Sequence, residues 1–405
     1  MKHLKYIICS LLLLSSCSSK PIYNDKDIVI LYTTDVHCAI DDKIGYSAVK
    51  AYKNQMIEED NYVSLLDAGD FIQGNFTGAV SKGQYIVDIM NEMGYDIVTI
   101  GNHEFDYGMD ALKKCIDNLN SEVISCNVTY DGNGTNKLSS IKPYTIKKYG
   151  KYKVGYVGVT TPHSLTESNP NSFKENGEFV YHFSNPTPED FYNTVQSNID
   201  EVNKKGVDYV ILLTHLGYTE TYKPYRSIDL INNTSGYDAV LDGHAHLDIN
   251  WEKIPNKDRK EIPLCDAGYQ LNEFGKLIIK KDGTIETDFI TEADKKDEKV
   301  ESVIQNIKSE IDEITNKVVG SIDVDLSIYD ENSIRIVRSR ETAIGNLIAD
   351  AYRNFGKADI GVANGGGIRT DLKKVMLLMV KLKLSIHMAT LYKSRKLKDK
   401  MFLII

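Results

Sequence analysis

Five short clusters of Asp, Asn and His lie between Asp35 and His246, and their residue types suit divalent cations. The clusters read Asp35-Val36-His37, Gly69-Asp70, Gly101-Asn102-His103-Glu104, Thr214-His215 and Gly243-His244-Ala245-His246. Imidazole nitrogen and carboxylate oxygen bind Zn²⁺, Mn²⁺ or Fe²⁺ at about 2.0–2.2 Å. A carboxylate can also bridge two ions that lie about 3.5–4 Å apart. We therefore predict a site for two divalent ions, with Asp35, His37 and His246 on one ion, Asn102, His215 and His244 on the other, and Asp70 between them.

The spacing within two of the clusters supports this prediction. Asp35 and His37 are two residues apart, as are His244 and His246. In an extended segment, side chains two residues apart point to the same side, so both members of a pair can reach one centre. A single histidine of this kind is more often a satisfied core or loop residue. Five clusters that each follow an apolar run disfavour that alternative.

The apolar runs indicate the elements that position these residues. Short β-branched runs predict buried strands at 28–32, 62–66, 96–100, 122–125, 153–159, 209–213 and 239–241. Helical patterns occupy 46–59, 85–93, 109–120 and 189–204. This alternation predicts an α/β fold with a mostly buried sheet. Ligands of open α/β sheets bind outside the carboxyl ends of the strands, so we expect the five clusters to converge on one crevice.

The motifs DxH, GD, GNHE, TH and GHxH, in this order, resemble those of the calcineurin-like metallophosphoesterases. The longer run from Gly101 to Asp106 resembles specifically the exported 5'-nucleotidase and 2',3'-cyclic phosphodiesterase group. The resemblance implies a four-layer αββα sandwich, a linker helix and a partial α/β substrate-binding domain. It also implies that His103 and Asp106 act as a catalytic dyad.

The chemistry implied by the resemblance is hydrolysis of nucleotide phosphate esters. Two cations (Zn, Mn or Fe) would polarise the phosphoryl oxygens and lower the pKa of a bound water from 15.7 toward about 7. Hydroxide would then attack phosphorus, while His103 stabilises the developing charge or protonates the leaving oxygen. The motifs leave open a 5'-nucleotidase, a 2',3'-cyclic phosphodiesterase with 3'-nucleotidase activity, and a UDP-sugar hydrolase. A nucleotide-binding lipoprotein without turnover is the alternative from another class.

A second segment follows an amphipathic stretch at 294–318, which we interpret as a linker helix. Arg340-Glu341-Thr342 and the run from Asn364 to Arg369 resemble the substrate-binding domain of the same family. The resemblance implies that Arg340, Asn364 and Arg369 bind the substrate, because guanidinium groups suit phosphate and an amide can bond a ribose hydroxyl. The aromatic residues that stack the base in this family find no match after Leu372, so the resemblance implies a truncated second domain.

The chain begins with Lys2, Lys5 and a short apolar stretch that ends at Leu14-Ser15-Ser16-Cys17. This pattern is typical of an export signal and resembles a bacterial lipoprotein cleavage box. We therefore expect a signal peptide at 1–17, lipidation of Cys17 and a tether at 18–27, which anchor the protein to the cell envelope outside the cytoplasmic membrane. The formal net charge of −9 disfavours polymeric nucleic acid as a partner.

The boundaries that follow are a metallophosphoesterase domain at 28–293, the linker at 294–318, the partial domain at 319–372 and a tail at 373–405. The tail carries nine Lys or Arg residues against one acidic residue, and we interpret it as an aberrant, frameshifted end. A genuine basic tail is the alternative. Outside the motifs, we interpret Cys38 as a residue that points away from the metal side, Trp251 as a packing residue, and His163 and His182 as surface or structural residues.

Overall fold

Two six-stranded sheets form the larger part of the protein. The computed structural model describes residues 24–40, 43–184, 186–368, 370–374, 376–378, 393–397 and 400–404. The predicted signal peptide, Cys17 and Arg369 lie outside these residues. The first sheet has the order β16 (Ile285–Ile290), β15 (Phe274–Ile279), β1 (Ile28–Thr33), β2 (Tyr62–Asp67), β3 (Ile97–Val98), β4 (Glu122–Val123). The second has the order β13 (Asp248–Pro255), β14 (Glu261–Ala267), β12 (Ala239–Asp242), β11 (Tyr209–His215), β7 (Tyr152–Thr160), β6 (Tyr144–Tyr149).

The predicted strands form the parallel part of each sheet. β1 to β4 are parallel neighbours, and so are β7, β11, β12 and β14. β14 was not predicted, although it is parallel to β12. The remaining strands of both sheets were not predicted either, and they are antiparallel: β15 pairs with β1, β16 with β15, β13 with β14, and β6 with β7. Because β15 adds directly to β1, the unpredicted strands extend the sheets without changing the edge at which the parallel strands end.

Alternation along the strands explains why the two sheets stack. In β1, Val29 and Leu31 belong to the core under the helices of the first sheet, whereas Ile28 and Ile30 belong to the core between the sheets. In β11, Ile211 and Leu213 face the first sheet, and Val210 and Leu212 face the opposite way. Strands that are apolar on both faces must be covered on both faces, which gives the continuous apolar runs seen in the sequence.

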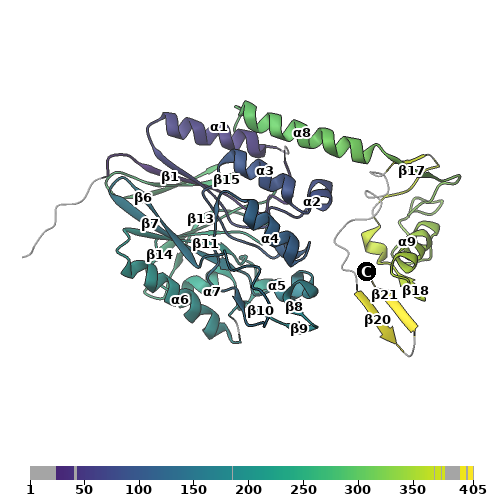
Figure 1. Cartoon of the computed structure of the whole chain (residues 1–405). Helices are drawn as coiled ribbons and strands as arrows, with labels where there is room; N and C mark the ends of the chain where they lie inside the picture. Colours follow the sequence, from purple (N-terminus) through teal and green to yellow (C-terminus); the bar gives the residue numbers. More distant parts are fainter. Residues whose placement is uncertain are drawn as a thin grey trace, which may run out of the picture.

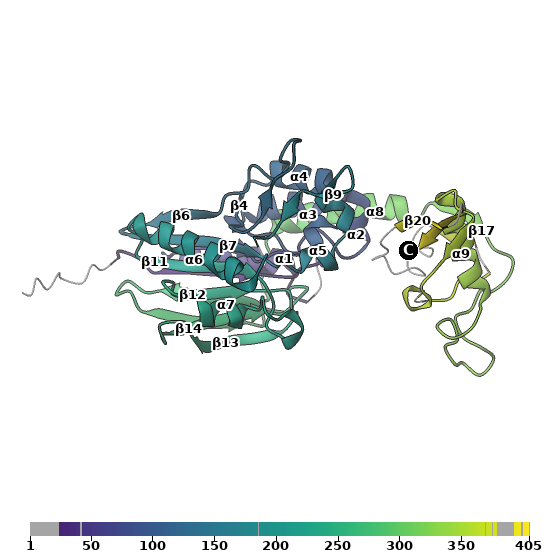
Figure 2. The ribbon, with the colours of Figure 1, turned by 90° about the horizontal axis from the view of Figure 1, so that it is seen from below.

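Helices cover the two outer faces, and this completes the predicted four-layer αββα sandwich (Figures 1 and 2). Helices α1 (Gly45–Glu58), α3 (Gln84–Met93) and α4 (Met109–Asn118) share a core with the first sheet. Helices α6 (Pro188–Lys204) and α7 (Ser227–Asn233) share another with the second sheet. The connections contain α2 (Phe76–Ser81), α5 (Ser164–Glu167), β5 (Thr129–Tyr130), β8 (Lys174–Glu175), β9 (Glu178–Phe179), β10 (Tyr181–His182) and the 3₁₀ turns η1 (His103–Phe105), η2 (Pro170–Phe173) and η3 (Glu220–Tyr222).

The predicted linker helix is α8 (Glu298–Thr315), which Asp297 caps through its carboxylate. Its apolar stripe of Val300, Ile304 and Ile307 is buried in the same core as α1 and α3. We expected a solvated helix between two domains. Instead, α8 is packed on the sandwich along its buried face, because its apolar period matches that of a core helix.

A smaller segment follows α8 and has its own apolar cluster, which includes Ile328, Val337, Ile344 and Leu372. It contains β17 (Val318–Ser321), α9 (Ala343–Phe355), β18 (Ile360–Val362), η4 (Gly365–Gly367) and β19 (Met376–Leu378). β20 (Lys393–Leu397) and β21 (Lys400–Ile404) form a sheet with β18. Figures 1 and 2 show α9 and β17 beyond the C-terminal end of α8. Among the described residues, no helix combines the length and the apolar character that crossing a membrane requires.

Candidate metal centre

The five clusters lie at the carboxyl ends of β1, β2, β3, β11 and β12, where Thr214 and His215 end β11 and the other clusters occupy the turns that follow their strands. Five of the seven predicted ligands have a positive φ: Asp35 (50°), His37 (48°), Asp70 (61°), His244 (81°) and His246 (55°). The argument from an extended segment was therefore wrong, since these residues occupy the left-handed region in tight turns. Such conformations cost about 1–3 kcal/mol each and cluster at functional sites.

The first ligand group contains Asp35, His37 and His246, one ligand atom of each lying within 4.8 Å of the others. The two imidazoles face each other with their Nε2 atoms 3.0 Å apart. Asp35 Oδ1 lies 3.3 Å from His246 Nε2 and 3.9 Å from His37 Nε2. These separations suit donors around one small cation, because ligand bonds of about 2.0–2.2 Å place neighbouring donors roughly 3–4 Å apart.

The second group contains Asp70, His215 and His244. Asp70 Oδ2 lies 3.1 Å from His215 Nε2 and also 3.9 Å from His37 Nε2 in the first group. Asp70 thus lies between the two groups. Although His244 and His246 are two residues apart, they join different groups.

Buried polar atoms without a hydrogen bond mark the places where cations fit. Such atoms are rare in folded proteins, and each needs an explanation. Among the described residues, the buried side-chain atoms of this kind include Asp35 Oδ1, Asp70 Oδ2, Asn102 Oδ1, His215 Nε2 and His244 Nε2. All five belong to predicted ligands and are donor types of borderline divalent ions. The residues present therefore fit a pair of such ions.

The protein also orients two of the imidazoles. His37 Nδ1 lies 3.0 Å from the carbonyl oxygen of Gln73, and His215 Nδ1 lies 2.8 Å from that of Ala68. Each Nδ1–H can donate to its carbonyl, which leaves the Nε2 lone pair free for a cation. This arrangement is the usual second layer around histidine ligands.

Three motif glycines allow the turns to approach each other. A Cβ at Gly101 would lie 2.2 Å from Asp70 Oδ1 and 2.7 Å from His215 Nε2. A Cβ at Gly243 would lie 1.9 Å from Thr34 Oγ1. Gly69 has a φ of +102° and approaches the Gly101 backbone closely as well. The GD, GNHE and GHxH motifs therefore need glycine before the ligand for steric reasons.

Glu104 organises this turn, a role that the sequence analysis missed. Its side chain is fully buried, and its carboxylate accepts hydrogen bonds from the backbone N–H groups of Asp70 (2.8 Å), Phe71 (2.9 Å), Ile72 (3.3 Å) and Gly101 (2.6 Å). Burial and the neighbouring charge of Asp70 raise the pKa of Glu104 to about 7. Glu104 thus joins the turn after β2 to the turn after β3 through hydrogen bonds to their backbones.

His103 begins the 3₁₀ turn η1 and Asp106 caps its C-terminal end, and residues three apart in such a turn lie above one another. His103 Nδ1 is 2.7 Å from Asp106 Oδ2, so the bond leaves Nε2 as the second donor of the protonated ring. Burial lowers the pKa of His103, but Asp70 and Asp106 outweigh it and raise the pKa to about 9. The structure therefore brings the predicted dyad together at the ligand cluster.

Electrostatics in the cluster favour added positive charge. Burial disfavours the charged form of Asp70, yet His215 and His103 hold its pKa well below the usual range. The pKa of His215 is raised well above its usual value, because Asp70 and Asp35 outweigh its burial. Without a cation, protonated imidazole balances the carboxylates.

A pocket of about 260 Å³ opens onto the cluster, lined by Asp70, Asn102, His103, Glu167, Tyr222, His244, Ala245 and His246. Glu167 and Tyr222 were not predicted. His163, which we interpreted as a surface or structural residue, has a ligand atom within 4.8 Å of ligand atoms of Glu167 and His244. Cys38 does point away, as predicted, with its Sγ donating to Ile72 O at 3.1 Å.

The predicted substrate residues lie in the smaller segment. Arg340 is exposed, and Asn364 accepts a hydrogen bond from Gly366 N at the start of η4. Within the described residues, no hydrogen bond or ion pair joins Arg340 or Asn364 to the metal ligands. The structure thus confirms neither role.

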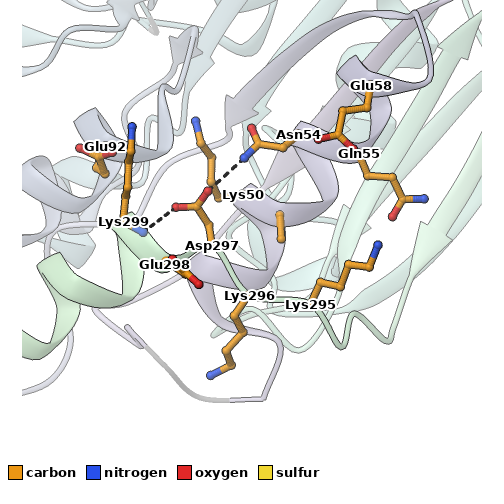
Figure 3. Close-up of a pocket in the computed structure, with 11 residues that line it drawn as sticks. Lys50, Asn54, Gln55, Glu58, Glu92, Lys295, Lys296, Asp297, Glu298 and Lys299 are labelled. Carbon is orange, nitrogen blue, oxygen red and sulfur yellow. Dashed lines mark hydrogen bonds between the residues drawn. The ribbon is translucent and has the colours of Figure 1, made fainter.

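A larger cavity of about 650 Å³ lies elsewhere, where α1 and α3 meet the start of α8 (Figure 3). Lysines and carboxylates line it together, and Asn54 donates to Asp297 at 3.0 Å. No histidine is among the residues that line it. This cavity therefore lacks the imidazoles that distinguish the metal centre.

Comparison with known proteins agrees with the site. Residues 64–261 match the family described as bacterial capsule synthesis protein PGA_cap, and residues 318–382 match the 5'-nucleotidase C-terminal domain. The chain is 27% identical to the trifunctional nucleotide phosphoesterase protein YfkN of Bacillus subtilis, over 86% of this chain and 25% of YfkN. It is 26% identical to the venom 5'-nucleotidase of Gloydius brevicauda, over 85% of this chain and 63% of that protein.

The fold has solved counterparts. A 5'-nucleotidase precursor from Thermus thermophilus superimposes with a TM-score of 0.63 at 22% identity, covering 89% of this chain and 73% of that one. The chain spans about a quarter of YfkN and just under two thirds of the Gloydius enzyme. With its two matched segments and its ligand cluster, the chain is similar to the 5'-nucleotidase and calcineurin-like phosphoesterase family.

Proposed function

We propose that this protein hydrolyses nucleotide phosphate esters with two divalent ions, releasing nucleoside and phosphate from nucleoside 5'-monophosphates. The observation that carries this proposal is the set of five buried donor atoms without hydrogen bonds, gathered beside the hydrogen-bonded pair His103 and Asp106. Asp35, His37 and His246 would hold one ion, Asn102, His215 and His244 the other, and Asp70 both.

When bound, the ions supply Lewis acidity and a water of lowered pKa. The side chains of the protein supply the proton donor and its orientation. His103 lines the pocket, and the carboxylate of Asp106 keeps it protonated and fixes its ring. Its remaining N–H can stabilise charge on a phosphoryl oxygen or deliver a proton to the leaving oxygen.

The nucleotide part of the proposal rests on the smaller segment and on the relatives. Residues 318–382 match the 5'-nucleotidase C-terminal domain, and several relatives carry the name 5'-nucleotidase. We assign phosphate or ribose binding to Arg340, Asn364 and Arg369. We also propose export and lipidation at Cys17, which would place the reaction outside the cytoplasmic membrane.

A broader phosphoester specificity is the second candidate, favoured by the relative named a trifunctional nucleotide phosphoesterase. It includes 2',3'-cyclic nucleotides and UDP-sugars. Rates on AMP, 2',3'-cyclic AMP, UDP-glucose and an aryl phosphate, with Mn²⁺ or Zn²⁺ added, separate these candidates. If no nucleotide is cleaved faster than the aryl phosphate, the nucleotide assignment fails.

The same assay on His103→Ala tests catalysis against a binding-only role. Loss of a general acid typically costs about 10²–10⁴ in rate, and we expect a loss in that range with the metal content unchanged. His182→Ala is the matched control, because this half-buried histidine pairs with Asp131 away from the pocket. Bound metal without turnover in the wild type would favour a nucleotide-binding protein.

A further inference from the structure

Three side chains beside the pocket form a group of which the two-ion assignment uses only one, His244. They are His163, Glu167 and His244, with one ligand atom of each within 4.8 Å of the others. Glu167 Oε2 lies 3.2 Å from His244 Nε2. Donors around a tetrahedral ion with bonds of about 2.0–2.2 Å lie roughly 3.3–3.6 Å apart. Small side-chain rotations therefore suffice to place these three donors around one ion.

Two nitrogens of the group are buried and lack hydrogen bonds. They are His163 Nδ1 and His244 Nε2. The His244 residue is only 8% exposed, so water cannot readily satisfy it from the bulk. Two unsatisfied imidazole nitrogens beside a carboxylate form a donor set for a cation, and imidazole with carboxylate is a ligand combination typical of zinc.

The local backbone holds two of the ligands in place. His163 precedes α5 and Glu167 ends it, so the two are four residues apart on a single turn. The Glu167 N–H donates to His163 O at 2.9 Å, which closes that turn. Ligands four residues apart on one helical face recur in zinc sites. The rings of Tyr222 and Tyr225 pack against His163, with centroids 5.9 and 5.8 Å away.

We propose that His163, Glu167 and His244 form a third cation site, which takes Zn²⁺ beside the two-ion centre. Three protein ligands leave one tetrahedral position for water, as in exchangeable zinc sites. The Nε2 lone pair of His244 can bind only one ion, so an ion in the third site takes His244 from the second ion, which keeps Asp70, Asn102 and His215. Occupation of the third site therefore weakens the second ion's coordination and fills the pocket, and zinc in excess inhibits the protein.

The first test counts bound metal and needs no turnover. The full chain is stripped with a chelator, dialysed against increasing concentrations of zinc and analysed by mass spectrometry of the metal. We expect three zinc ions per wild-type chain at saturation, the third binding most weakly. His163→Ala and Glu167→Gln should each bind two over the same range, or bind the third at least about tenfold more weakly, since even outer partners are worth about 10- to 100-fold in metal affinity.

The control variant is His182→Ala, which should keep three ions, and circular dichroism checks that every variant is folded. A wild-type chain that saturates at two ions would overturn the third site, as would three ions of unchanged affinity in both pocket variants. If the wild-type chain binds one ion and His163→Ala binds none, the result would support the third site and contradict the two-ion centre.

The second test concerns inhibition and rests on the proposed hydrolysis. Hydrolysis of an aryl phosphate is followed in Mn²⁺ while zinc is added. We expect His163→Ala to raise the half-inhibiting zinc concentration at least about tenfold over the wild type. Equal zinc sensitivity in wild type, His163→Ala and Glu167→Gln would overturn the inhibitory role, whatever the metal count shows.

Discussion

Among single residues, Asp70 and Asp106 together favour the protonated form of His103. The pKa of His103 is about 9, against an ordinary 6.5, although burial opposes the charged ring. A histidine with a raised pKa stabilises the folded chain fully below pH 6.5 and loses that contribution as the pH rises through 9. In the chelated chain, we expect the free energy of unfolding to fall over this interval.

Asp106→Asn should reduce that fall, because the neutral amide no longer favours the imidazolium. His215 also has a raised pKa, but it is present in both the wild type and Asp106→Asn. The difference between their pH dependences of unfolding free energy therefore reports on His103. Denaturant unfolding at pH 6.5 and pH 9 measures the effect. Asp131→Asn is the control, because Asp131 is an exposed carboxylate that pairs with another histidine, His182. Equal pH dependence in wild type and Asp106→Asn would contradict the assigned role of Asp106.

Glu104 supports the ligands through backbone contacts. In Glu104→Gln, one acceptor oxygen becomes an NH₂ group that faces backbone N–H donors, so at least one buried donor loses its partner. An unsatisfied buried donor costs about 1–3 kcal/mol, and we expect a loss of about 2–4 kcal/mol in unfolding free energy. Metal affinity should fall as well, because the turn that carries Asp70 loosens. The exposed Glu58→Gln should leave both quantities unchanged in chemical denaturation and metal titration.

The sequence predicted which side chains lie together in this site but not how they do so. Residue types at strand ends were sufficient to place Asp35, His37 and Asp70, since the edge of a parallel sheet gathers whatever follows its strands. The left-handed turns could not be predicted from spacing. Glu167 and Tyr222 follow β7 and β11 in the same way, so the same rule would have found them in the longer turns after these strands.

At the scale of elements, buried parallel strands were the most predictable, because they are apolar on both faces. The antiparallel strands β13, β15 and β16 alternate or carry charge. β13 and β16 pair with their neighbours in sequence, β14 and β15, whereas the pairing of β15 with β1 joins segments far apart in sequence. For helices, the period of the apolar residues predicted that a helix forms but not which part of the protein packs against it. The sequence of α8 indicates an apolar stripe without stating which surface covers it.

The packing of α8 on the sandwich has a testable consequence. Ile304 is fully buried in the core that contains α1 and α3, so Ile304→Ala creates a cavity there. Such truncations cost about 2–5 kcal/mol. Gln305→Ala on the exposed side of the same helix should change stability by less than about 0.5 kcal/mol. Similar unfolding midpoints for the two variants would show that α8 is a free linker.

For the whole molecule, the proposed function requires the metal centre and the smaller segment to act on one substrate. The ligands lie in the sandwich, whereas Arg340 and Asn364 lie in the segment beyond α8 (Figure 1). Sequence motifs identified both parts. They carry no information on the distance between them, because that depends on how the segment is placed around the end of one helix.

Arg340→Ala measures whether the two parts cooperate. A charge-assisted hydrogen bond is worth about 1.5–3 kcal/mol, so its loss should raise the KM for AMP by roughly 10- to 100-fold. An aryl phosphate lacks the nucleoside, and its kcat/KM should change by less than about twofold if Arg340 contacts that part. If Arg340 instead contacts the transferred phosphate, both substrates lose equally. Arg353→Ala on α9 is the matched control, since this exposed arginine pairs with Asp350. Unchanged kinetics with both substrates in Arg340→Ala would mean that the smaller segment does not bind the substrate through this residue, and that the sandwich alone sets specificity.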